Sequence, residues 1–183
     1  MGRLEQMLSL RHWTAADLAD LPEDGLRYEA LDGQLVVTPP PVARHQAVAF
    51  ALARQLHAEA PPDWLVLPGQ AVRMGTDWRI PDLIVVPSGV PLDGLFYEPA
   101  DVGLAIEVVS ASSRRLDRVV KPAEYAEAGI ARYWRVETDP RVVVVAYELR
   151  AGAYVEVPPS APFPVHLDVA GLEPPRPGQT FLS

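Results

Sequence analysis

One stretch of the sequence, residues 102–109, constrains the fold more than any other. It reads Val-Gly-Leu-Ala-Ile-Glu-Val-Val, apolar except for Glu107. Such a run is typical of a β-strand that is buried on both faces of a sheet. A carboxylate in a strand of this kind costs several kcal/mol to bury unless a partner or a metal ion satisfies it. The fold must therefore supply a partner for Glu107.

A second carboxylate precedes another apolar run. Pro81-Asp82 leads into Leu83–Val86, and the proline-rich loop that follows suits a hairpin-like return, so we expect Asp82 and Glu107 to lie side by side. Two carboxylates and a backbone carbonyl suit Mg²⁺ or Mn²⁺. An ion pair between Glu107 and Arg114-Arg115 explains the buried carboxylate equally well, and both interpretations stay open on spacing alone.

The chain contains a single lysine, Lys121, although Lys and Arg together number 16. It falls in a helix expected near Asp117–Ala128, directly after the strand that carries Glu107. We expect its ammonium to lie over both carboxylates, where it can orient a water or stabilise negative charge at a phosphate. A leftover surface lysine is the simpler alternative.

The remaining pattern predicts one α+β domain. Thr14–Leu21 has the signature of a short capped helix, and Val42–Ala60 has apolar residues at helical spacing. Asp32-Gly33 is a strong hairpin signal. The expected strands are Leu26–Leu31, Gln34–Thr38, Trp64–Leu67, Ala71–Met74, Arg79–Val86, Val102–Val109, Ala131–Glu137, Val142–Leu149 and Ala153–Val157.

Composition and missing motifs exclude several classes of protein. The formal net charge of −8 argues against coating nucleic acid by bulk electrostatics, and the absence of cysteine excludes disulfides and thiolate metal sites. Phosphate-binding glycine loops, the serine hydrolase elbow and paired zinc-binding histidines do not occur. No apolar run reaches the length of a membrane span, and residues 1–10 do not resemble a secretory signal. We therefore expect a cytoplasmic protein.

The ordered motifs resemble a known group of nucleases. Pro81-Asp82, Glu107-Val108-Val109 and Lys121 are similar to the PD-(D/E)XK, restriction-endonuclease-like superfamily. Its usual lysine, two residues after the Glu, is Val109 here, and a lysine moved to the next helix is a known variant. The chain resembles, more specifically, the bacterial Uma family of endonucleases. The matching segments are 27–35, 80–86, 106–110, 117–121 and 124–134.

This resemblance implies a restriction-endonuclease-like core of class α+β or α/β, with a central mixed β-sheet flanked by helices and extra β-hairpins. The core would span residues 14–157, and residues 158–183 would form a proline-rich wrap. It also implies a site for Mg²⁺ or Mn²⁺ held by Asp82, Glu107 and Val108, with nuclease activity on DNA. It brings Glu29 into the site, where the alternative is an exposed hairpin residue. Pro122 departs from the family pattern and is harmless only in the first turn of its helix.

Other residues admit two interpretations each. His45 borders the apolar helix face, and a structural role is favoured over a role in the site. Arg114-Arg115 and Arg118 either hold a phosphate or lie in a solvated turn. We assign no base-stacking role to Trp78, Tyr133 or Trp134.

Three functions remain in view: an active endonuclease, a nuclease fold that no longer cleaves and serves as a binding module, and a structural β-rich protein with a buried ion pair. A homodimer contact through Val157–Gln179 is a further expectation.

Overall fold

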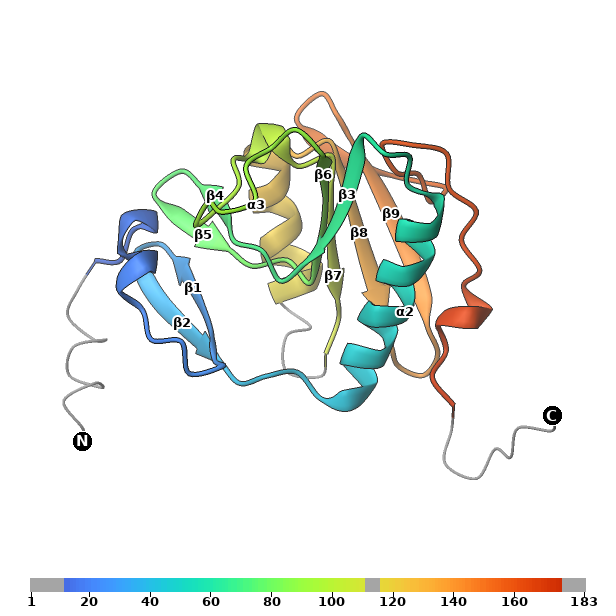
Figure 1. Ribbon diagram of the computed structural model, residues 1–183, viewed down its shortest axis with the longest axis horizontal. Coiled ribbons are helices and arrows are strands. Elements are labelled where there is room, and N and C mark those ends of the chain that lie inside the picture. The colour runs from blue at the N-terminus through green and yellow to red at the C-terminus, as the bar shows by residue number, and fades with distance from the viewer. Residues whose placement is uncertain (1–11, 111–115, 176–183) are drawn as a thin grey trace.

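The computed structural model describes residues 12–110 and 116–175 and contains two β-sheets (Figure 1). Arg114-Arg115, residues 1–10 and the end of the expected dimer segment lie outside the described residues. The larger sheet is mixed: β7 and β8 run parallel, and every other neighbouring pair is antiparallel. Its order is β10-β9-β8-β7-β6-β3, formed by Ala153–Val157, Val143–Arg150, Arg132–Glu137, Leu104–Val108, Leu83–Pro87 and Trp64–Pro68.

The smaller sheet is antiparallel and contains the predicted hairpin. Asp32 and Gly33 both have positive φ angles, 50° and 72°, as a two-residue hairpin turn requires. This sheet has the order β2-β1-β5-β4, formed by Gln34–Thr38, Arg27–Leu31, Asp77–Arg79 and Val72–Met74.

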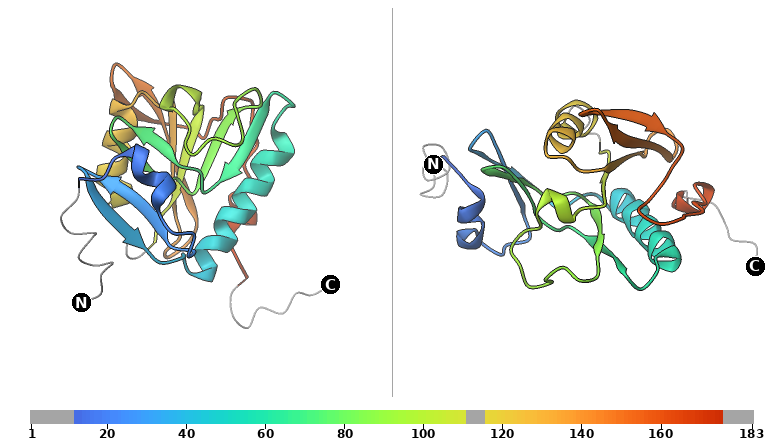
Figure 2. Two further views of the ribbon diagram at one scale, coloured as in Figure 1. Left: turned by 60° about the vertical axis from the view of Figure 1, so that its left-hand side comes forward. Right: turned by 90° about the horizontal axis from the view of Figure 1, so that it is seen from above.

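Helices cover both faces of the larger sheet (Figures 1 and 2). The helix α2, Ala43–Glu59, confirms the long helix predicted from the apolar stripe, and buries Val48, Leu52 and Leu56 against one face. On the other face lies α3, Lys121–Glu127, preceded by one turn of π-helix, η3, Leu116–Val120. Short 3-10 turns complete the list: η1 Ala15–Asp20, η2 Pro99–Asp101 and η4 Ala170–Leu172.

Side-chain alternation along β7 decides which face receives the buried carboxylate. Leu104, Ile106 and Val108 pack in the core on the α2 side, whereas Ala105 packs in the core that contains Tyr125 of α3. Because successive side chains of a strand point to opposite faces, Glu107 shares the face of Ala105. The carboxylate therefore points toward α3.

The prediction of one continuous strand over Arg79–Val86 is wrong. The chain leaves the smaller sheet after Arg79 and enters the larger sheet at Leu83, so Ile80-Pro81-Asp82 crosses between the two sheets. The physical reason is Pro81, which has no N–H to donate to a strand ladder. Asp82 consequently lies at the junction of the sheets.

Two smaller expectations are confirmed at helix ends. Thr14 and Asp17 form a capping box at the start of η1, with the Asp17 carboxylate accepting from the Thr14 N–H at 2.8 Å. Gly129 follows α3 with φ +84°, the left-handed conformation of a C-terminal cap.

After β10, Ala161, Phe163 and Leu172 pack into the core on the α2 side. Within the described ranges, no helix is long and apolar enough to cross a membrane.

Candidate functional site

The structure brings Asp82 and Glu107 together. In the antiparallel pair β6–β7, Leu83 lies opposite Ile106, so the next position outward sets Asp82 beside Glu107. The N–H of Val108 donates to Asp82 Oδ2 at 2.8 Å, which ties the two strands at this point. Both carboxylates are buried, 5% and 1% exposed.

Three groups from three different elements hold Asp82. Arg27 of β1 donates to Oδ1 at 2.9 Å, and His45 Nε2 of α2 lies 3.0 Å from Oδ2, the oxygen that also accepts from Val108. Burial favours the protonated acid, but the hydrogen bond to His45 and the charge of Arg27 outweigh it and lower the pKa of Asp82 to about 2. His45 thus contacts the site, where the sequence favoured a structural role.

Glu107 is held on one oxygen, from the face covered by α3. Lys121 Nζ lies 2.9 Å from Oε1, and the Tyr125 hydroxyl donates to the same oxygen at 2.6 Å. Burial raises the pKa of Glu107 to about 8, against the opposing charge of Lys121 and with the added repulsion of neighbouring carboxylates. The two adjacent carboxyl groups therefore have pKa values displaced in opposite directions.

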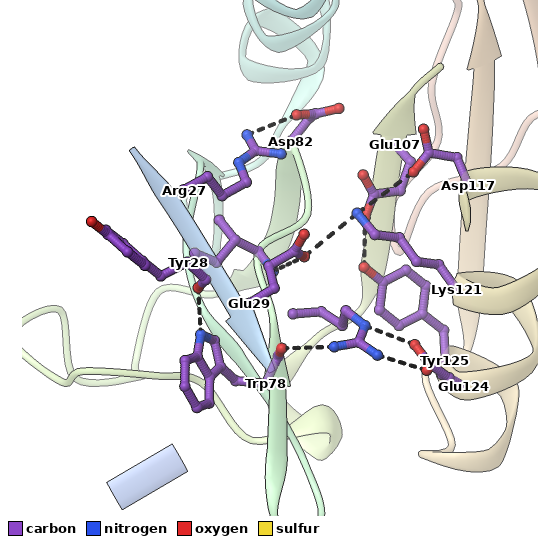
Figure 3. Close-up of polar contacts among 12 residues, drawn as sticks. Arg27, Tyr28, Glu29, Trp78, Asp82, Glu107, Asp117, Lys121, Glu124 and Tyr125 are labelled. Carbon is purple, nitrogen blue, oxygen red and sulfur yellow. Dashed lines mark hydrogen bonds and ion pairs between the residues drawn. The ribbon is translucent and has the colours of Figure 1, made fainter. Parts of the chain in front are cut away.

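Lys121 does not lie over both carboxylates, as the sequence had suggested. Its ammonium lies 2.9 Å from Glu107, 3.5 Å from Glu29 and 3.6 Å from Asp117, and within the described residues it forms no ion pair with Asp82 (Figure 3). The carboxylate oxygens of Asp82 instead contact Arg27 and His45. The helix instead directs Lys121 toward the carboxylates on its own side.

Glu29 is buried in the site rather than exposed on the hairpin. It is 3% exposed, and its Oε1 accepts from the N–H of Ile80 at 2.8 Å in addition to facing Lys121. Strand β1 of the smaller sheet thus contributes the carboxylate of Glu29 to the site.

Sequence reasoning missed three residues of the site, Arg27, Asp117 and Tyr125. Their spacing could have revealed them: Arg27 is two positions from Glu29 on a strand, and the other two are four positions before and after Lys121 on a helix. Residues at these spacings share a face.

A bidentate ion pair fixes the smaller sheet against α3. Arg79 of β5 donates through Nε and Nη2 to the two oxygens of Glu124, at 2.8 and 2.7 Å. Its remaining nitrogen donates to the backbone carbonyls of Ala30 and Trp78. This fork holds β5 against α3, and the bond to Ala30 connects the same arginine to β1, the strand that carries Glu29.

The donor chemistry of the site fits a divalent cation. Within the described part of the chain, four carboxyl groups face two permanently charged cations, so the site carries surplus negative charge when the carboxyl groups ionise. No three of the described acidic or histidine side chains converge to hold a metal alone. Mg²⁺, however, commonly takes one or two carboxylates and completes its shell with water and phosphate. The groups are Glu29, Asp82, Glu107, Asp117, Arg27 and Lys121.

A cavity of about 440 Å³ adjoins the His45 side of the site. The first turn of α2 and the residues after β7 and β8 line it, among them Val109, Ser110 and Thr138. His45 is the link between the two, because it lines the cavity and contacts Asp82 through Nε2.

The other candidates lie away from the carboxylates or are buried. Arg118 pairs with Glu137 at 2.8 Å in an exposed position. Trp78, Tyr133 and Trp134 are fully buried in the core, which agrees with the absence of a base-stacking role.

Comparison with known proteins agrees with this architecture. A solved structure titled as a putative nuclease belonging to DUF820, from Anabaena variabilis, superposes with a TM-score of 0.69. It is 16% identical, and the match covers 87% of this chain and 96% of that one. No curated protein matches the sequence. The model of the family Uma2, described as "Putative restriction endonuclease", matches residues 15–173. The chain thus belongs to the Uma2 family, with the mixed sheet and flanking helices of a nuclease fold.

Proposed function

We propose that this protein is an endonuclease that hydrolyses phosphodiester bonds of DNA with the help of Mg²⁺ or Mn²⁺. The observation that carries the proposal is the adjacent, buried pair Asp82 and Glu107, with a lysine ammonium 2.9 Å from Glu107. A structural ion pair needs one carboxylate and one cation. This site has two further carboxylates, from β1 and from η3.

Asp82 and Glu107 would hold the cation, with the carbonyl of Val108 as a third ligand. When bound, the cation would lower the pKa of a water ligand and stabilise charge on the phosphate. A carboxylate must be ionised to bind a metal ion. Because burial raises the pKa of Glu107 to about 8, Glu107 would have to release its proton before it binds the cation.

Lys121 would position the attacking water or share the charge that develops on the phosphate. Its contact with Glu107 is a short hydrogen bond, whereas the distances to Glu29 and Asp117, 3.5 and 3.6 Å, exceed good hydrogen-bond length. Two of the three N–H groups of the ammonium would therefore be available to that water. Glu29 would hold that water or a second ion.

The first experiment tests the cation site directly. Mn²⁺ is titrated into the wild-type protein and into D82N, with melting temperature and calorimetric heat as readouts. A ligand bound only by the folded state stabilises it by about 2.7 kcal/mol at 100 times its dissociation constant. We expect saturable stabilisation in the wild type, loss in D82N, and retention in D63N, which removes the same charge from an exposed turn.

Cleavage of plasmid and linear DNA in Mn²⁺ is then compared across the same three proteins. The proposal predicts that D82N loses cleavage and keeps its fold by circular dichroism. Cleavage by D82N at the wild-type rate would contradict the assignment of Asp82.

A catalytically inactive binding module is the second candidate function. The observation in its favour is that both carboxylates are already satisfied by side chains of this chain, while Val109 stands where the usual lysine of the superfamily would be. Nucleic-acid binding that persists in EDTA, together with a wild type that does not respond to Mn²⁺, would select this candidate.

A further inference from the structure

Among the cationic side chains that the structure describes at the site, only Arg27 is appreciably exposed to solvent. The side chains of Lys121 and His45 are 4% and 8% exposed, whereas that of Arg27 is 25% exposed. Arg27, the first residue of β1, extends toward Asp82 (Figure 3). A negatively charged group that enters from solvent therefore meets Arg27 before it meets Lys121 or His45.

The guanidinium of Arg27 has N–H groups that are not used in hydrogen bonds to the described residues. Within the described residues its guanidinium makes one hydrogen bond, from Nη2 to Asp82 Oδ1 at 2.9 Å. A guanidinium carries five N–H groups in a rigid fork, which matches the oxygens of a phosphate. Arg79 offers a contrast, because Nε, Nη1 and Nη2 of that guanidinium all donate within the protein.

The surrounding charge makes such a group necessary. A phosphate brought beside Asp82 and Glu107 also faces Glu29 and Asp117, and like charges at short range repel strongly in a buried site. A cation between the carboxylates offsets part of this repulsion. The solvent-facing side of the phosphate needs a second positive group, and Arg27 is the described side chain that can supply it.

We infer that Arg27 is the residue that binds the backbone phosphate of the nucleic acid at this site, keeping one N–H on Asp82 and giving others to the phosphate oxygens. The inference rests on the proposed function and adds the group that recognises the substrate. Because the contact reads a phosphate and not a base, it positions any sequence in the same way.

The test measures binding of a fluorescein-labelled 20-base-pair DNA duplex by anisotropy at several salt concentrations. Ca²⁺, a hard cation that also takes carboxylate oxygens, replaces Mn²⁺. The proteins compared are the wild type, R27Q, R27K and R150Q. Arg150 is 60% exposed in the β9–β10 hairpin and provides a control for loss of one positive charge.

We expect R27Q to bind the duplex at least about tenfold more weakly and to lower the slope of log K against log salt by about one. R27K should keep the slope, because the charge remains, yet lose affinity, because an ammonium lacks the fork. R150Q should match the wild type in both quantities. Calorimetry of Mn²⁺ binding by R27Q should still show the saturable site, since Asp82 and Glu107 remain.

Wild-type affinity and slope in R27Q would overturn the inference and leave the proposed function intact. Loss of Mn²⁺ binding or of cooperative folding in R27Q, with an unchanged salt slope, would also overturn it, because Arg27 would then only support Asp82. A wild type that binds no duplex in Ca²⁺ and cleaves none in Mn²⁺ would overturn both proposals.

Discussion

Glu107 shows at the scale of one residue how burial and charge compete. Its pKa of about 8 in the folded protein lies above the ordinary value of 4.5, chiefly because it is buried. Between these two pH values the folded state binds more protons than the unfolded state, so the free energy of unfolding falls as pH rises. Asp82 behaves in the opposite way: its contribution is present above pH 3.8 and is lost as pH falls toward about 2.

Replacing Glu107 with Gln tests this directly, because Gln has nearly the same shape and no charge to bury. We expect E107Q to gain stability relative to the wild type as pH rises from 5 to 8, in metal-free buffer. Urea unfolding at both pH values measures the difference, and E156Q, at an exposed position in β10, serves as control. An equal difference between E107Q and wild type at both pH values would contradict the raised pKa.

At the scale of elements, the helix that carries Lys121 begins in an unusual way. Pro122 is the second residue of α3, and α3 directly follows the π-helical turn η3. A proline cannot donate a hydrogen bond to the preceding turn. The backbone carbonyl of Asp117 in that turn accepts from the Tyr133 hydroxyl of β8 at 2.8 Å. A side chain from the neighbouring strand thus satisfies a carbonyl next to the irregular start.

Removing this hydroxyl takes a buried hydrogen bond away from the carbonyl of Asp117. We expect Y133F to lower the free energy of unfolding by about 1–3 kcal/mol, measured by urea denaturation. Y147F is the matched control, because Tyr147 stacks on Tyr133 and its hydroxyl has no hydrogen bond within the described residues. Equal effects of the two substitutions would show that the bond to Asp117 contributes nothing.

The elements that sequence predicts well are those with local signals. Asp32-Gly33 specifies a turn through its positive φ angles, and the spacing of apolar residues specifies α2. The run that contains Pro81 was misjudged, because hydropathy continues through Ile80 while the hydrogen-bonding partner changes from one sheet to the other. Partner choice depends on tertiary packing, which a local pattern does not contain.

At the scale of the whole molecule, the sequence predicted which residues lie close together but not which of them pair. Asp82, Glu107, Glu29 and Lys121 were proposed together and are found together. The pairing of Lys121 with Glu107 rather than Asp82 depends on how α3 lies on the sheet. That placement involves long-range contacts such as the fork from Arg79 to Glu124, between residues 45 positions apart.

The position of Asp82 has a consequence for local opening of the chain. Its two oxygens accept from β1, α2 and β7, so one carboxylate joins both sheets and a helix. In D82A, amide hydrogen exchange should therefore accelerate in β1 and the first turn of α2 while β9 and β10 keep their wild-type rates. Uniform acceleration would contradict this coupling. Asp82 is thus a structural connection between the two sheets and α2 as well as a candidate ligand. D82N keeps the side-chain shape and one acceptor oxygen, so it tests the role of Asp82 as a ligand with less disturbance of the fold than D82A.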